Sequence, residues 1–139
     1  MRRARTDEEV ERALDLRWRV FCEEQGVDPA AERDGRDGEA VHLVALRSDS
    51  LVGTCRLLVG EDTVRLGRAA VGRADRGGGI GAALLEAADR VALEAGAERI
   101  CLHAQTAARG LYERSGYRAR GEPFLEEGIE HVTMEKRLG

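Results

Sequence analysis

The pattern of hydrophobic and polar residues predicts a first helix followed by three strands. Between residues 7 and 21, apolar side chains recur three or four positions apart, the spacing of one face of a helix. Thr6, with Glu9 three residues later, forms a capping-box pattern at the start of this helix. Three apolar segments separated by short polar turns then predict an antiparallel meander over residues 40–47, 51–59 and 63–71.

The rest of the chain alternates helices and strands. A helical repeat over residues 79–95 ends before Gly96, a residue type that commonly terminates helices. The strands on either side of it, 63–71 and 99–104, therefore form a parallel crossover unit. A helix over 107–115 and strands over 117–121 and 129–137, the latter two joined by a polar turn at Glu126-Glu127-Gly128, complete the chain, and residues 2–5 are a candidate first strand. These elements predict a mixed α/β fold with a mainly antiparallel central sheet flanked by helices.

Length and composition limit the class of protein. The 139 residues suit one domain over 1–139, and 42% hydrophobic with 35% charged residues is typical of a globular chain. The net charge of −4 gives no reason to expect nucleic acid as a partner. No apolar run approaches the roughly 20 residues of a membrane span, and the N-terminus lacks the apolar core of a signal peptide. We therefore expect a cytoplasmic protein with no membrane partner.

The three cysteines are Cys22, Cys55 and Cys101, widely spaced and without a C-x-x-C pair. This usage indicates a reducing compartment and argues against a disulfide framework or a metal site. Cys101 lies within an apolar strand with no adjacent histidine, so a structural role is expected for it. His42, in a strand without a motif around it, is also interpreted as structural.

Residues 23–39 differ from the rest in being rich in Glu and Asp, with three glycines and one proline. One interpretation is a solvated acidic loop. The other is a lid or rim that attracts a cationic substrate.

The most informative stretch is the segment 76–82, Arg-Gly-Gly-Gly-Ile-Gly-Ala. Glycine accepts positive φ values and lets a ligand approach the backbone closely. The helix that follows begins with unpaired N–H groups and a partial positive charge, a combination that binds anions. Strand, glycine turn and helix together predict a site for a phosphate or pyrophosphate group.

Three kinds of phosphate loop compete for this assignment. A Walker A loop requires Lys-Ser/Thr after the last glycine, where this chain has Ala82-Ala83. A dinucleotide fingerprint is formally matched by Gly77, Gly79 and Ala82, but the next strand ends at residues 104–105 without an acidic residue for a ribose. The third possibility is an acyl-CoA loop.

Two motifs resemble those of the GNAT superfamily of acyl-CoA-dependent N-acyltransferases. Arg76-x-x-Gly79-x-Gly81 resembles its motif A, and residues 108–117, Ala-Arg-Gly-Leu-Tyr-Glu-Arg-Ser-Gly-Tyr, resemble its second signature. The segments 19–25, 32–37 and 128–131 are similar to the ElaA-like branch of the superfamily. The resemblance covers nearly the whole chain in the expected order, and it implies the GNAT fold with its parallel crossover around the acyl-CoA loop.

The resemblance also implies a reaction, the transfer of an acetyl group from acetyl-CoA to a primary amine of a small molecule or peptide. The amine attacks the thioester directly, without an acyl-enzyme. Tyr112 corresponds to the family's tyrosine that protonates the leaving thiolate. Glu24, His103 and His131 are the candidates for the general base, and the residues alone do not choose between them.

The same resemblance assigns the groups that bind CoA. Tyr112 lies beside the thioester, and Gln105 stands where many members carry asparagine along the pantetheine arm. The pyrophosphate contacts come from Arg76 and from the N–H groups of Gly77, Gly78, Gly79, Gly81 and Ala82, and the pantetheine pairs with the backbone of Ala69 and Val71.

Two other functions stay open on the sequence. One is a non-catalytic acyl-CoA-binding or regulatory module, and the other is a nucleotide-binding domain. A homodimer is compatible with the chain, although no feature argues for it.

Overall fold

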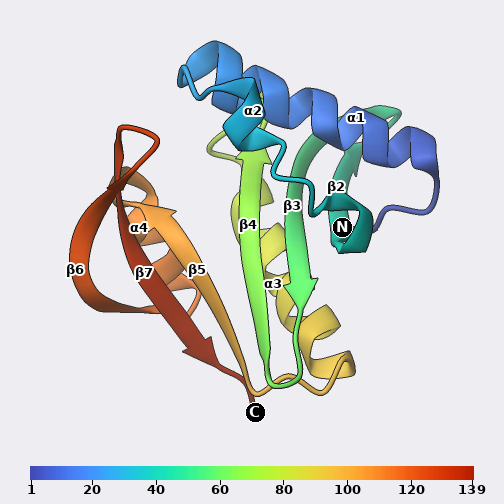
Figure 1. Cartoon of the computed structure of the whole chain (residues 1–139). Helices are drawn as coiled ribbons and strands as arrows, with labels where there is room; N and C mark the ends of the chain where they lie inside the picture. The colour runs from blue at the N-terminus through green and yellow to red at the C-terminus, as the bar shows by residue number, and fades with distance from the viewer.

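The computed structural model describes residues 1–139 and contains one seven-stranded sheet in the order β1-β2-β3-β4-β5-β7-β6 (Figure 1). The strands are β1 (Arg2–Arg3), β2 (Val41–Arg47), β3 (Ser50–Val59), β4 (Thr63–Val71), β5 (Arg99–Gln105), β6 (Arg118–Glu126) and β7 (Ile129–Arg137). The α-helices are α1 (Asp7–Arg17), α2 (Pro29–Glu32), α3 (Ile80–Glu94) and α4 (Arg109–Arg114). None of the helices has both the length and the apolar character needed to span a membrane.

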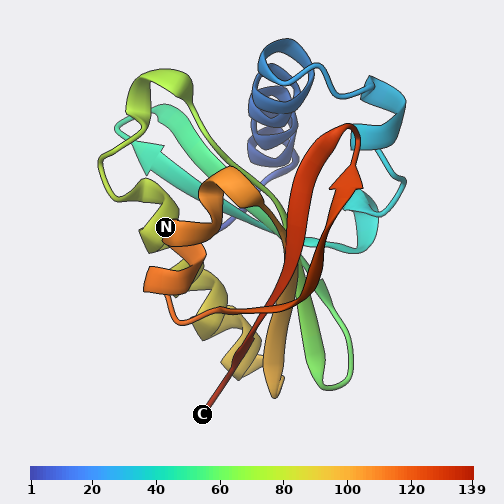
Figure 2. The same ribbon diagram turned by 90° about the vertical axis from the view of Figure 1, so that its left-hand side faces the viewer.

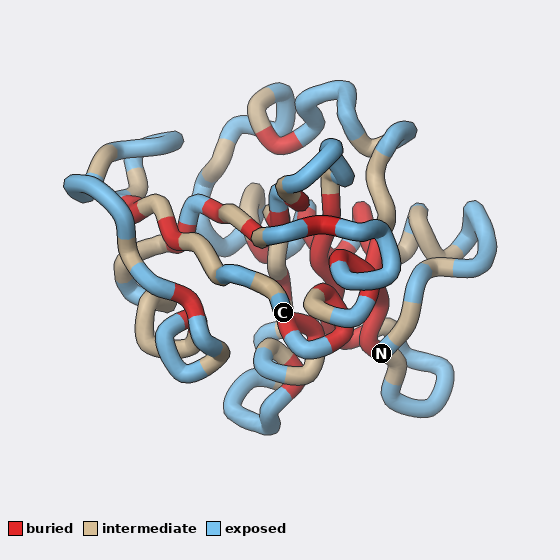
Figure 3. Tube along the Cα trace, turned by 90° about the horizontal axis from the view of Figure 1, so that it is seen from below, coloured by how far each residue is buried: buried red, intermediate tan, exposed pale blue.

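The helices cover the sheet in two layers. Figure 2 shows α3 and α4 on one side of the sheet and α1 with α2 on the other. The larger hydrophobic core, of 22 buried residues, lies between the sheet and α3, and a small cluster of Leu16, Val20 and Ala70 lies under α1. The buried segments gather in the middle of the molecule, and the exposed turns surround them (Figure 3).

The sheet separates between β4 and β5. These strands are parallel and pair only from Thr63 to Leu66 with Arg99 to Leu102. Arg68 then adopts a left-handed conformation with φ 54°, and the pairing of β3 with β4 shifts register at this point. Such a bulge bends the strand. The last part of β4, up to Val71, therefore diverges from β5, as Figure 1 shows.

The expected mixed α/β class, the meander and the parallel crossover are confirmed. Three boundaries differ from expectation. The first helix continues as a wider π-helical segment, Trp18–Glu24, before the chain turns. The segment 23–39 contains α2 and a 3₁₀ turn, Asp37–Glu39. Strand β6 is longer than predicted, because its pairing with β7 resumes at Phe124 after an irregular stretch and Pro123 is tolerated on an edge strand.

The acidic segment is neither a solvated loop nor a free rim. Three of its carboxylates alternate with three arginines from α1, β3 and β4 in a closed circuit of ion pairs, with Arg17 and Glu32 almost completely buried. We call this the arginine–carboxylate ring, and it consists of Arg17, Glu32, Arg68, Asp34, Arg56 and Asp37.

The ring ties the acidic segment to the sheet. Arg17 Nη2 lies 2.6 Å from Glu32 Oε2, and Arg17 Nη1 lies 2.8 Å from Asp37 Oδ1. Arg56 Nη1 lies 2.8 Å from Asp34 Oδ1 and 3.3 Å from Asp37 Oδ1. Because these carboxylates are already neutralised, they are not available to attract a cationic substrate.

Candidate functional site

The glycine loop between β4 and α3 has the backbone of an anion cradle. Gly77 and Gly79 have φ values of 83° and 85°, in the left-handed region that favours glycine. A Cβ atom at either position would meet nothing within 4 Å, so packing does not require glycine there. None of the hydrogen bonds within the chain uses the N–H groups of residues 77–82. The exposed loop therefore presents six successive free donors at a helix N-terminus, as an oxyanion ligand requires.

Gly81 has a different reason to be glycine. A Cβ atom on it would lie 3.1 Å from Leu111 Cδ2, so its absence lets α3 approach α4 closely. Gly78 and Ala82 are exposed, and the space around Gly78 would admit a Cβ atom.

Gly79→Ala is expected to weaken CoA binding about tenfold or more, because a side chain at φ 85° distorts the donors of the cradle. Gly96→Ala is the matched control, since Gly96 ends the same helix at φ 79° with open space around it. Both variants should lose about 1 kcal/mol of folding free energy. Calorimetric titration with CoA should separate them, and equal CoA affinity in the two variants would remove the loop from the binding site.

A cavity of about 570 Å³ opens in front of the sheet and reaches into the gap between β4 and β5. The end of the first helix, the acidic segment, β3, β4, β5, α4 and the β6–β7 hairpin all contribute to its wall. Beyond Leu66, β4 has no strand partner on the β5 side, so the backbone of Ala69 and Val71 borders the cavity along an unpaired edge. An extended polar ligand can pair with such an edge.

Tyr112 reaches this cavity from α4, behind the sheet. Its ring packs edge-on against Tyr117 at 5.9 Å, and its hydroxyl is used in no hydrogen bond within the chain. Burial raises the pKa of Tyr112 to about 12, with the Cys55 thiol nearby adding to the shift. The phenol is therefore neutral and protonated near pH 7, as a proton donor must be.

Glu24 and Arg76 form a bidentate ion pair at the rim of the cavity. The two Arg76 Nη atoms lie 2.9 and 3.0 Å from the Glu24 carboxylate, and Arg76 Nε donates to the carbonyl of Val71 at 3.0 Å. Hydrogen bonds from Arg76 lower the pKa of Glu24. Arg76 thus joins the end of the π-helical segment to the end of β4, and Glu24 is a weakened proton acceptor.

Gln105, at the end of β5, pairs with Gln25, which follows the π-helical segment. Gln105 Nε2 donates to Gln25 Oε1 at 2.8 Å, with the reciprocal contact at 3.4 Å. The sequence analysis gave Gln25 no role of its own. The signal for it was present, because Gln25 belongs to the segment 19–25 that is similar to the ElaA-like branch.

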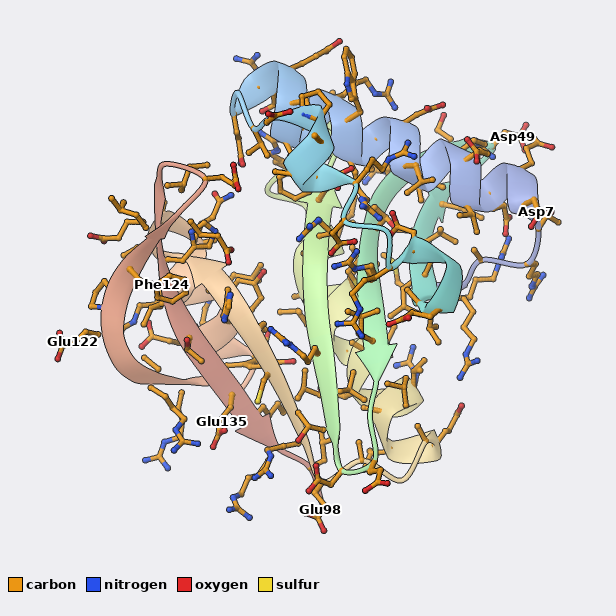
Figure 4. All side chains as sticks on the ribbon, in the orientation of Figure 1. Asp7, Asp49, Glu98, Glu122, Phe124 and Glu135 are labelled. Carbon is orange, nitrogen blue, oxygen red and sulfur yellow. The ribbon has the colours of Figure 1, made fainter.

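His103 and His131 meet at the β6–β7 hairpin. Their rings contact Phe124, at centroid distances of 5.0 and 6.1 Å (Figure 4 labels Phe124). His103 Nδ1 donates to Glu126 Oε1 at 3.1 Å, and His131 Nε2 lies 3.7 Å from Glu126 Oε2. Sequence reasoning placed Glu126 only in a turn and missed it, because the register of three strands brings it beside both histidines.

His131 has a defined tautomer. Its Nδ1 lies 2.7 Å from the carbonyl oxygen of Ile129, which can only accept, so the proton of the neutral ring is on Nδ1. The lone pair of Nε2 is then free on the side of Glu126. His131 is buried and pairs in register with Gln105, beyond the point where β4 and β5 separate, whereas the His103 side chain is 37% exposed.

The remaining candidates lie outside this chemistry. Burial, with the Glu135 charge adding to it, raises the pKa of the Cys101 thiol, so Cys101 is a poor nucleophile. His42 Nε2 donates to the carbonyl of Asp37 at 3.0 Å in the interior. No group of three or more His, Cys, Asp or Glu side chains is arranged to hold a metal ion.

Comparisons with known proteins agree with this geometry. A family model described as "Acetyltransferase (GNAT) domain" matches residues 2–138. The uncharacterized N-acetyltransferase YjcF of Bacillus subtilis (strain 168) is 33% identical, with 96% of each chain covered. The crystal structure of an acyl-CoA N-acyltransferase from Pseudomonas aeruginosa is 35% identical with a TM-score of 0.84, covering 95% of this chain and 92% of that one. Escherichia coli ElaA is 27% identical with a TM-score of 0.84 and the same coverage, so the expected likeness to ElaA is confirmed.

Proposed function

Because the chain belongs to the GNAT acetyltransferase family, we propose that it transfers the acetyl group of acetyl-CoA to a primary amine of a small molecule or peptide. One observation carries the proposal. The free N–H groups of the glycine loop and the unbonded Tyr112 hydroxyl lie on either side of the gap where β4 and β5 separate. A phosphate-bearing donor held at the loop and along β4 would present its reactive end near Tyr112.

The residues of the site fit CoA. The N–H groups of residues 77–82 suit the pyrophosphate, since no acceptor within the chain uses them. The unpaired edge of β4 at Ala69 and Val71 and the amide of Gln105 suit the pantetheine arm. Arg76 can add a charge-assisted bond to phosphate if it exchanges its ion pair with Glu24. When bound, acetyl-CoA supplies an activated thioester as the acyl donor.

His131 is the general base that the geometry favours. Nε2 of the neutral ring can accept a proton from an amine, and the Glu126 carboxylate 3.7 Å away can bind the incoming ammonium and then stabilise the imidazolium. Glu24 is disfavoured because its ion pair with Arg76 lowers its pKa. His103 uses Nδ1 for Glu126 and lies in the more exposed part of the hairpin.

The reaction then balances within these groups. A C–N bond forms between the amine and the acetyl carbon while the C–S bond breaks. The amine proton passes to His131, and the Tyr112 hydroxyl proton passes to the departing thiolate. No acyl-enzyme is needed, in keeping with the raised pKa of the Cys101 thiol.

His131→Gln is expected to lower kcat/KM at pH 7 by about 10- to 100-fold, because an alkylamine near pKa 10.4 must lose a proton before it attacks. The deficit should shrink as the pH approaches 10, where the amine is deprotonated in solution. His103→Gln is the matched variant on the same aromatic cluster and should change kcat/KM less than threefold. The reverse order of effects would assign the base to His103.

A thiol-release assay with a panel of primary amines tests the function as a whole. Acetyl-CoA should raise the melting temperature, and at least one amine should accelerate CoA release. Binding of acetyl-CoA with no response to any amine would point to an acyl-CoA-binding module. A melting temperature raised by NAD or ATP and unchanged by CoA would point to a nucleotide-binding domain.

A further inference from the structure

The cavity wall contains five arginines, and carboxylates within 4.0 Å neutralise four of them. The neutralised pairs are Arg36 with Glu39, Arg56 with Asp34, Arg68 with Glu32 and Arg76 with Glu24, at 2.5, 2.8, 3.2 and 2.9 Å. Arg65 is the fifth, and its guanidinium takes part in no ion pair and no hydrogen bond within the chain. An unsatisfied guanidinium on a cavity wall is suited to bidentate contact with a carboxylate or phosphate.

Arg65 lies at the closed end of the gap between β4 and β5. It pairs in register with Leu58 on β3 and with Cys101 on β5, within the short stretch where the two parallel strands still touch. Its neighbours in the wall at this level are therefore an aliphatic side chain and a thiol with a raised pKa, so they offer it no anion.

The opposite wall carries the unneutralised acids. Glu126 contacts the two histidines, and Glu127 follows it in the hairpin turn with no ion-pair partner. An ammonium group is favoured there, beside the free Nε2 of His131. The cavity is thus anionic at the hairpin and cationic at Arg65, which complements a ligand with separated positive and negative charges.

The register gives the separation of these charges. From Cys101 to Gln105 is four residues along β5, and Arg65 and His131 pair on opposite sides of that strand. Their Cα atoms are therefore about 16 Å apart, at about 3.3 Å per residue and 4.8 Å per strand. The two side chains cover roughly half of this distance, which leaves about 5–10 Å between an anion at Arg65 and an amine at His131.

We propose, building on the acetyl-transfer function above, that the acceptor is a small ω-amino acid type of molecule, with a terminal primary amine at His131 and Glu126 and an anionic group at Arg65. The α-amine of an amino acid lies too close to its own carboxylate to reach both walls. An amine at the far end of a chain of about five carbons spans the distance. The anion can be a carboxylate or a phosphate, since a guanidinium binds both.

The test compares 6-aminohexanoate with 6-aminohexanamide in the thiol-release assay. The pair differs only in the negative charge, and kcat/KM should be about 10- to 100-fold higher for the carboxylate, the range expected for a charge-assisted bond. Arg65→Gln should remove this preference while leaving the amide rate within threefold. Arg118→Gln is the matched control, an exposed and unpaired arginine outside the cavity wall, and should keep the preference. A 5-aminopentyl phosphate arm distinguishes phosphate from carboxylate.

Equal use of the carboxylate and the amide, or a preference that survives Arg65→Gln, would overturn the inference and leave the acetyl-transfer function intact. Calorimetric titration of 6-aminohexanoate into the CoA-bound protein gives an independent readout. Arg65-dependent binding without turnover of any amine would support the inference and contradict the proposed reaction. Absence of binding together with turnover of simple alkylamines would do the opposite.

Discussion

Replacing Tyr112 by phenylalanine is expected to lower kcat by about 10²- to 10⁴-fold, the range for loss of a positioned general acid, with little change in acetyl-CoA affinity. The hydroxyl makes no hydrogen bond within the chain, so its removal breaks no structural contact. The ring that packs against Tyr117 is retained. Steady-state kinetics together with titration of acetyl-CoA measure the two effects separately.

Tyr117→Phe is the matched control for this substitution. Tyr117 lies on the same aromatic pair, but its hydroxyl is buried without a partner and its side chain is not part of the cavity wall. Removing an unsatisfied buried hydroxyl should leave kcat unchanged and should not destabilise the fold. Equal losses of kcat in the two variants would mean that the aromatic pair acts through packing and that Tyr112 is not the acid.

The pH dependence of kcat gives a second check on Tyr112. A general acid works only while protonated, and burial raises the pKa of Tyr112 to about 12. The rate should therefore show no fall from loss of this proton between about pH 8 and pH 10. A descending limb near pH 10 that disappears in Tyr112→Phe would contradict the raised pKa.

Arg17→Met is expected to lower the free energy of unfolding by about 3–5 kcal/mol, the cost of leaving a buried ion-pair partner without its counter-charge. Arg17 is 1% exposed, and it donates to both Glu32 and Asp37. Denaturant unfolding measures the loss. Arg19→Met, an exposed position without an ion pair two residues further on, should cost less than about 0.5 kcal/mol.

A double variant separates lost attraction from stranded charge. Arg17→Met combined with Glu32→Leu removes both charges of the buried pair, and it should recover part of the stability lost in Arg17→Met. No recovery would mean that Asp37, the other partner of Arg17, accounts for the loss.

Acid should weaken the same ring. Hydrogen bonds from Arg56 lower the pKa of Asp34, and for Asp37 those from Arg17 outweigh the opposing effect of burial, so its pKa is also lowered. The unfolded chain then binds protons at a higher pH than the folded one. This stability is complete above the ordinary aspartate pKa of about 3.9 and is lost as the pH falls toward the lower folded values. The loss should be smaller in Arg17→Met, where Asp37 no longer has that hydrogen bond.

The parts of the site that were readable in advance are those formed by neighbouring residues. The glycine cradle depends on the conformations of residues 77–79 and on the helix start that follows them directly. Tyr112 was identified by the signature on its own helix, and its place on the cavity wall agrees with that expectation. The role assigned to each of these residues remains a prediction.

Glu126 was missed for the opposite reason. Its carboxylate reaches His103 and His131 only because β6 pairs with β7 across an irregular stretch and β7 then pairs with β5 (Figure 4 shows Phe124 on this hairpin). A shift of one residue in either register would turn these side chains to the other face of the sheet. The acidic segment was misread in the same way, because the arginines that neutralise it come from α1, β3 and β4, distant in the chain.

The sequence by itself determined the mixed α/β class, the anion cradle and the family, because hydrophobic period, turn chemistry and helix starts are properties of short segments. Only the tertiary structure decided which charges remain free in the cavity. Arg65 and Glu127 are two charged residues among many in the printed sequence, and they stand out only once the other charges of the wall have found partners or contacts. That pairing is set by strand register and by the bulge that separates β4 from β5, which no local pattern encodes.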